Sequence, residues 1–155
     1  KELAAQAALT VALTTDAGVE AYEAVITEYE GTAAANTATY LKGAELLKAG
    51  DIAGAKAALE KYVDAEGAAA EVFNGLVYTL RGDIAVEEND LQSAVDFFTK
   101  AIAASADVET CEKNSTKLAL VYRAMGNVAK EQETYKALVA SYPELNQKYA
   151  KYIAE

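Results

Sequence analysis

Apolar residues recur at helical spacing in three stretches of the chain, 49–62, 88–101 and 125–138. Each stretch contains a turn pair after its first residue: Gly50-Asp51, Asn89-Asp90 and Gly126-Asn127. The first residue of the pair tolerates a left-handed backbone, and the second can cap a helix. An aliphatic residue follows, and then three more positions at intervals of three, four and three residues, which lie on one face of an α-helix. These faces are Ile52, Ala55, Leu59 and Tyr62; Leu91, Ala94, Phe98 and Ala101; and Val128, Glu131, Tyr135 and Leu138.

A small residue lies twelve positions before the second residue of each face. Small side chains let two helix backbones approach closely, so this spacing predicts an antiparallel helix pair with small residues opposite each other in the first two copies. Such a pair cannot bury its apolar face alone, and neighbouring pairs must stack. The positions are Gly43 with Ala55, Gly82 with Ala94, and Ala119 with Glu131.

The repeated pattern resembles the tetratricopeptide repeat family, whose unit has about 34 residues. Counted from the anchors, the units start at Asn36, Gly75 and Glu112, and Pro143 then falls where the family often has proline. The resemblance implies an all-α fold, a right-handed superhelix of stacked antiparallel helix pairs. Asn89 and Glu131 depart from the family's Gly and Ala, so we expect looser packing in the third pair.

The predicted repeats occupy residues 36–74, 75–111 and 112–142 of a single domain, 1–155. Residues 1–35 read as a degenerate helix pair. Residues 143–155 begin with proline, which suits a helix N-terminus, and are predicted to form the capping helix that a solenoid needs.

A closer resemblance is to inner-membrane-anchored tetratricopeptide repeat proteins of Bacteroidetes. It is carried by "VITEYEGTAAANTATYLKGAELLKAGDIAGAKAALEKY" and "RGDIAVEENDLQSAVDFFTKAI". This resemblance implies a periplasmic location, with the cytoplasm as the alternative, and membrane contact only through an N-terminal anchor that this chain lacks.

The charge limits the classes of partner and of chemistry. Fourteen basic and 24 acidic residues give a net charge of −10, which argues against binding to nucleic acid or to an anionic membrane surface. The chain has no histidine and one cysteine, which excludes His-based catalytic and metal sites and an internal disulfide. We therefore predict no enzymatic activity, no catalytic residues, no metal and no cofactor.

Two short motifs have simpler explanations than the functions they suggest. Arg81-Gly82-Asp83 matches an integrin-binding tripeptide, but it falls inside a predicted helix, where close helix contact explains the glycine. Asn114-Ser115-Thr116 matches a glycosylation sequon, also in a predicted helix, and is read as accidental.

The predicted function is protein–protein interaction, as a scaffold or adaptor in the bacterial cell envelope. The alternative is an accessory factor that contacts a secretion or envelope-assembly complex laterally. A less favoured interpretation is a small-ligand binder or an enzyme. The resemblance implies that four positions of each first helix line a groove for a protein or peptide partner. The candidate groove residues are Tyr40, Leu47, Thr79, Asp83, Lys113, Thr116 and Arg123, with Thr37, Ala44, Leu76, Val86 and Leu120 at the remaining positions.

Two of these residues have predicted roles. Tyr40 is expected to anchor a partner segment, and Arg123 to pair with an acidic group on it. Because the rest of the chain is acidic, we expect a basic partner.

Overall fold

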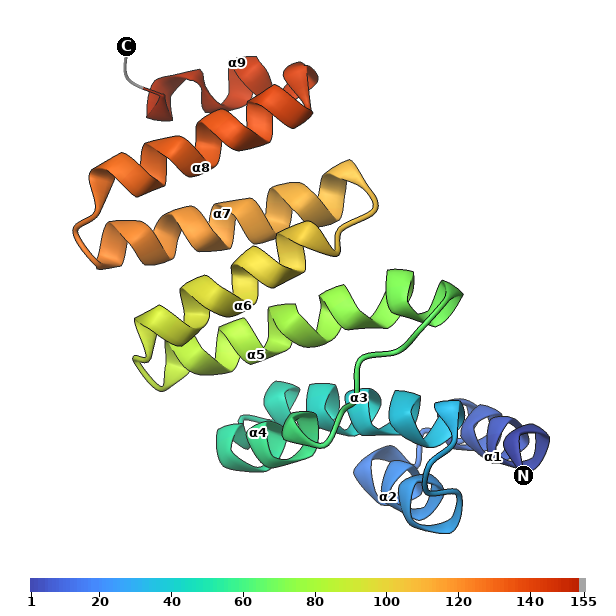
Figure 1. Cartoon of the computed structure of the whole chain (residues 1–155). Helices are drawn as coiled ribbons and strands as arrows, with labels where there is room; N and C mark the ends of the chain where they lie inside the picture. The colour runs from blue at the N-terminus through green and yellow to red at the C-terminus, as the bar shows by residue number, and fades with distance from the viewer. Residues whose placement is uncertain (154–155) are drawn as a thin grey trace. The chain divides into compact units, whose positions relative to one another are not determined.

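The computed structural model describes residues 1–153, and this part of the chain is all-α, as predicted (Figure 1). The helices form two compact units, unit 1 (Lys1–Phe73) and unit 2 (Asn74–Glu155). Within each unit, helices that are consecutive in the chain pack against one another. This is the arrangement expected of stacked helix pairs.

Unit 1 contains two helix pairs, and the first of them lies within residues 1–35. Its core includes Leu9, Tyr22 and Val25, which pack with the buried alanines of the third helix. The helices are α1 (Glu2–Thr14), α2 (Gly18–Glu28), α3 (Ala33–Lys48) and α4 (Ile52–Glu60).

Unit 2 contains the other two helix pairs. A π-helical turn, η1 (Ala70–Asn74), leads directly into the first helix of this unit. The helices are α5 (Gly75–Glu87), α6 (Leu91–Ala103), α7 (Val108–Ala124) and α8 (Val128–Ser141).

Two first helices begin before the predicted unit starts at Asn36 and Glu112. The Thr32 hydroxyl accepts a hydrogen bond from the Ala35 N–H at 3.1 Å, and Asp107 accepts one from the Thr110 N–H at 2.8 Å. These side chains cap α3 and α7, because they satisfy N–H groups that have no partner in the first turn.

All three turn pairs have the predicted conformation. The first residue is left-handed in each, with φ of 83° at Gly50, 57° at Asn89 and 73° at Gly126. The next N–H returns to the carbonyl five residues earlier, as in a Schellman motif. The following Asp51, Asp90 and Asn127 side chains then cap α4, α6 and α8.

In each of the three repeated faces, every residue except the first is buried. The other nine residues are each at most 7% exposed, and the set includes Leu59, Phe98 and Glu131. The first residue differs between copies: Ile52 and Leu91 are half-buried, whereas Val128 is 59% exposed. The predicted register of the repeats is therefore confirmed, with its weakest contact at the start of α8.

The predicted contact of small residue with small residue is wrong in detail. A Cβ on Gly82 would lie 2.5 Å from Cε1 of Phe98, and one on Gly43 would lie 2.5 Å from Cγ of Leu59. The glycine thus makes room for the large side chain four residues after the predicted alanine. Ala94 and Ala55 are fully buried but are not the nearest neighbours of these glycines.

The predicted capping helix, residues 143–155, is broken into short pieces: η2 (Pro143–Leu145), α9 (Asn146–Tyr149) and η3 (Ala150–Tyr152). Residues three apart eclipse in a 3₁₀ turn, which brings Tyr149 and Tyr152 to the same side. Their ring centroids lie 5.3 and 4.8 Å from that of Tyr135 in α8. The last two residues of the predicted helix lie outside the described part of the chain.

Within residues 1–153, no helix has both the length and the apolar character needed to cross a membrane.

We expect Gly82→Ala to destabilise the protein. Better helix propensity contributes about 1 kcal/mol, but overpacking against a ring typically costs about 1–3 kcal/mol. Phe98 is only 1% exposed, so its ring has little room to move. Urea titrations should show a net loss in the free energy of unfolding of up to about 2 kcal/mol. In a Phe98→Leu background, Gly82→Ala should lower the free energy of unfolding by less. An equal loss in both backgrounds would contradict the contact between Gly82 and Phe98.

Candidate functional site

The first helices of unit 2, α5 and α7, share a face that combines exposed apolar residues with polar contacts. Leu76, Asp83 and Val86 recur along one side of α5, and Lys113, Thr116 and Leu120 along one side of α7. We call these six residues the first-helix face. Leu76 is 36% exposed, Val86 41% and Leu120 50%. All three were predicted to line the groove, and they give this face a hydrophobic surface accessible to a partner.

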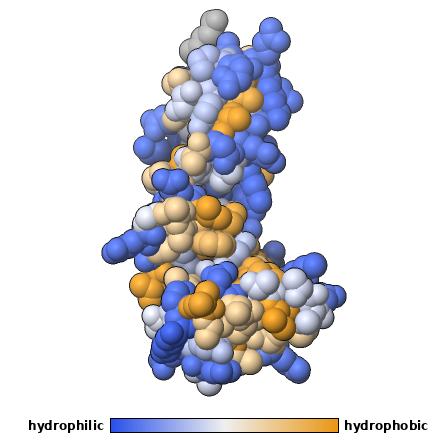
Figure 2. All heavy atoms as spheres, turned by 90° about the vertical axis from the view of Figure 1, so that its right-hand side faces the viewer, coloured by the Kyte–Doolittle hydropathy of each residue, from blue (hydrophilic) through white to orange (hydrophobic). Residues whose placement is uncertain are grey.

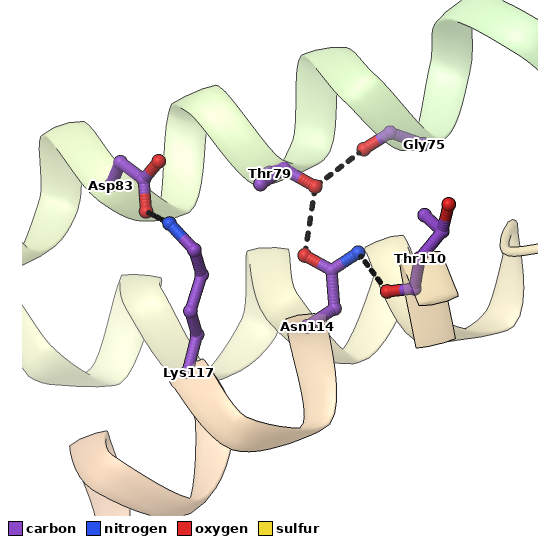
Figure 3. A network of polar contacts seen from close by, with 6 residues as sticks. All are labelled: Gly75, Thr79, Asp83, Thr110, Asn114 and Lys117. Atoms are coloured by element: carbon purple, nitrogen blue, oxygen red, sulfur yellow. Dashed lines mark hydrogen bonds and ion pairs between the residues drawn. The ribbon is translucent and has the colours of Figure 1, made fainter. Parts of the chain in front are cut away.

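A buried hydrogen-bond network fixes α5 beside α7 (Figure 3). Asn114 is fully buried, and its Oδ1 accepts a hydrogen bond of 2.8 Å from the Thr79 hydroxyl. That hydroxyl also lies 2.9 Å from the Gly75 carbonyl, while Nδ2 of Asn114 donates to the Thr110 carbonyl at 3.0 Å. Burial of polar groups requires such partners, so the network specifies how the two helices align.

The network changes the interpretation of two residues. Thr79 was predicted to line the groove, but it is 5% exposed and faces Asn114 rather than solvent. The position was assigned from α5 alone, and the polar partner comes from a different helix. Asn114 is inaccessible to glycosylation, which supports the reading of its sequon as accidental.

Asp83 forms an ion pair with Lys117, one turn further along α5 and α7 (Figure 3). Both side chains are 30% exposed, so the pair lies at the edge of the surface. The Lys117 ammonium also lies 5.8 Å from the centroid of the Phe98 ring. Asp83 is thus engaged within the protein, and Gly82 is buried beneath Phe98. The Arg81-Gly82-Asp83 tripeptide is therefore a packing feature of α5 and is not displayed on a loop.

Arg123, predicted to receive an acidic group from a partner, already has one within the chain. Its Nε donates to Oε1 of Glu131 at 2.9 Å, and this interaction raises the pKa of Arg123. Glu131 is 7% exposed, at a position where the first two repeats carry alanine. The guanidinium compensates the buried carboxylate, which explains how the third pair tolerates it. The Arg123 side chain is 52% exposed, and its pairing with an acidic group on a partner stays a prediction.

The C-terminal segment borders the first-helix face through Glu112. Its carboxylate accepts hydrogen bonds from Lys148 and from the Tyr149 hydroxyl, and both lower the pKa of Glu112. Burial, followed by the bond to Glu112, raises the pKa of Tyr149. Thr116 lies close by, with its hydroxyl 3.4 Å from that of Tyr149. Lys113, one turn earlier on α7, is exposed to solvent.

The predicted groove residues of unit 1 are Tyr40 and Leu47. Tyr40 is half-buried, its ring centroid lies 5.7 Å from that of Phe73, and burial raises the pKa of its hydroxyl. Leu47 is half-buried as well. Because these residues belong to unit 1, they are not part of the first-helix face of unit 2.

Residues 76–108 and 116–144 each match a family model described as "Tetratricopeptide repeat". These matches support the tetratricopeptide repeat family. The first match covers α5 and α6, and the second covers the C-terminal half of α7 together with α8. No curated protein and no solved structure matches the chain significantly.

Tetratricopeptide repeats suggest a protein–protein interaction module, typically without catalytic activity. Within residues 1–153, no group of three or more His, Cys, Asp or Glu side chains is placed to hold a metal ion. Sequence reasoning had missed Asn114 and Lys117, which join α5 to α7. The only available signal was their polarity next to predicted groove positions.

Thr79→Val should destabilise unit 2 by about 1–3 kcal/mol, because it leaves the buried Oδ1 of Asn114 without a donor. Thr39→Val in α3 is a matched control. Thr39 is equally buried, but its hydroxyl bonds only the Ala35 carbonyl, at 3.0 Å. Urea titrations of both variants measure the difference. A loss for Thr39→Val as large as that for Thr79→Val would show that the Asn114 bond contributes nothing.

Acid should loosen the C-terminal segment. The pKa of Glu112 is lowered below its ordinary value of 4.5 in the folded protein, so its contribution to stability is present above that pH. The contribution is lost as the pH falls through the lower, folded pKa. Near-ultraviolet circular dichroism of the stacked tyrosines reports the attachment. In the parent chain, the urea midpoint should be higher at a pH of about 6 than at a pH of about 3, and Glu112→Gln should make this difference smaller. An unchanged difference would mean that other carboxylates account for it.

Proposed function

We propose that this chain is a protein-binding scaffold or adaptor of the bacterial cell envelope, and that a partner binds to the first-helix face of unit 2. One observation carries the proposal for this face. Leu76, Val86 and Leu120 are the large hydrophobic residues of α5 and α7 that remain exposed in unit 2, and all three occupy positions where the family binds its partners.

The setting of these residues supports a binding surface. The buried Asn114 network and the Asp83–Lys117 pair hold α5 and α7 in one arrangement before any partner arrives. A pre-ordered surface loses less conformational entropy on binding, so modest apolar contacts suffice. The ion pair and Lys113 provide polar groups that would orient a partner on the face.

The cell-envelope setting rests on the resemblance of two long stretches to envelope-anchored repeat proteins. Exposure to separate envelope and cytoplasmic extracts tests this setting.

Leu120→Glu should abolish retention of partners that the parent chain retains, because it places a charge where apolar contact is needed. Immobilised parent and variant chains are exposed separately to envelope and cytoplasmic extracts, and retained proteins are compared by mass spectrometry. We expect partners in the envelope extract to lose at least about tenfold in retained amount.

Val128→Glu is the matched control, since Val128 is 59% exposed at the start of α8 and lies outside the first-helix face. It makes the same chemical change and should retain the partners. Equal losses for both variants would contradict the first-helix face as the site. Partners found only in the cytoplasmic extract would contradict the envelope assignment.

A further inference from the structure

A cavity of about 740 Å³ lies in unit 1. Its walls are the end of α2, the first half of α3, and the segment 61–73 that follows α4. Ligand sites for small molecules span about 300–1,000 Å³, so this cavity has room for more than one side chain. It lies in unit 1 and shares no residue with the first-helix face of unit 2.

Two contacts hold the segment 61–73 against α3. The Asn36 side chain makes both backbone hydrogen bonds of Val63: Nδ2 donates to the Val63 carbonyl at 2.7 Å, and Oδ1 accepts from its N–H at 3.0 Å. Near the other end of the segment, Phe73 packs on Tyr40. The segment is therefore fixed at two points, and the cavity between them is part of the folded structure.

The extra length of this repeat supplies the cavity wall. Copies of the turn pair are 39 residues apart here, against about 34 in the family. Nine residues, 61–69, separate α4 from η1, whereas four residues, 104–107, separate α6 from α7. Residues 68 and 69 are helical and continue through η1 into α5, so the non-helical connection is 61–67. Residues 61–66, with Ala69 and Phe73, form a wall that the shorter connection in unit 2 cannot form.

The chemistry of the cavity indicates its occupant. Ile26, Val63 and Phe73 contribute apolar surface, and Val63 is 70% exposed. Glu30 and Glu66 lie at the cavity with both residues exposed, and Lys61 is the one basic residue among those lining it. Unit 1 as a whole has five basic and twelve acidic residues, a net charge of −7, against −3 for residues 74–155. On the face seen in Figure 2, hydrophobic residues reach the surface of this unit, in the lower part of the view.

We propose that this cavity binds a segment of a partner protein in which apolar side chains are flanked by lysine or arginine. The apolar side chains enter the cavity, and the flanking cations lie near Glu30 and Glu66. Opposite charges at the rim of a site speed association and select the partner, while the buried apolar contact supplies most of the affinity.

The test uses the whole chain and a short acetylated peptide with a central Leu-Phe pair between lysines. A second peptide replaces Leu-Phe by Ser-Ser, and a third replaces the lysines by glutamates. Binding is measured by fluorescence polarisation and mapped by amide chemical shifts. We expect only the first peptide to bind well, with shifts concentrated in residues 31–39 and 61–73.

Charge-reversed variants separate the cavity from general electrostatic attraction. Glu30→Lys with Glu66→Lys should weaken binding about tenfold. Glu20→Lys with Glu45→Lys changes the net charge equally, at exposed residues of α2 and α3 that do not line the cavity, and should change binding less than about twofold. Val63→Ser removes apolar wall but keeps the backbone bonds to Asn36, and should weaken binding severalfold. Val11→Ser, at an exposed position of α1, is its control.

Several results would overturn the proposal. Equal losses for the two charge-reversed pairs would mean non-specific attraction. Binding of the Ser-Ser peptide as tight as that of the Leu-Phe peptide would exclude apolar insertion, and absence of binding would exclude this class of occupant. An alkylammonium ion that binds as tightly as the peptide would identify a small-molecule site. None of these results bears on the first-helix face, whose variants lie in unit 2.

Discussion

The close approach of two helix backbones over a large buried side chain determines how the first two repeats are built. In unit 2, the Phe98 ring lies where a Cβ on residue 82 would have to be, and in unit 1 Leu59 occupies the same place beside Gly43. Close packing leaves little freedom in how the helices of a pair are offset. Once the pair is fixed, the neighbouring turns of its first helix are fixed as well. Val86 lies one turn after Gly82 on α5, so its position follows from the contact between Gly82 and Phe98.

Polar residues determine how neighbouring pairs align, because apolar packing alone tolerates small shifts in register. Asn114 can keep both its bonds only when Thr79 and the Thr110 carbonyl are in their observed places. Glu131 has a similar constraint in the last pair, since it is buried and depends on Arg123. Buried polar groups specify a single arrangement through the cost of leaving them unpaired. In this protein they join α5 to α7 and α7 to α8.

The sequence predicted the features that depend on residues close together in the chain, and it missed those that depend on contacts between helices. The turn pairs and the 3-4-3 faces depend on residues within one helix and its cap, and both were predicted with their register. Thr79 and Arg123 were assigned to a groove because the family resemblance places groove-lining positions there. The residues that engage them, Asn114 and Glu131, lie on other helices, and a position within one repeat carries no information about such partners. The wall at 61–73 and the C-terminal turns follow no repeat, so their contacts with Asn36 and Tyr135 could not be predicted.

Repeat proteins can acquire new surfaces between their helix pairs at little cost to the pairs. Stability in such proteins is approximately a sum of terms within each repeat and between nearest neighbours. A connection lengthened after α4 leaves the Gly43–Leu59 contact untouched, and loop entropy rises only slowly with length. Asn36 and Tyr40 on α3 then secure the added residues at two points. Asn36, Tyr40 and Gly43 follow one another at intervals of four and three residues, so they lie on one face of α3. The added segment is therefore secured directly beside the contact that holds the pair together.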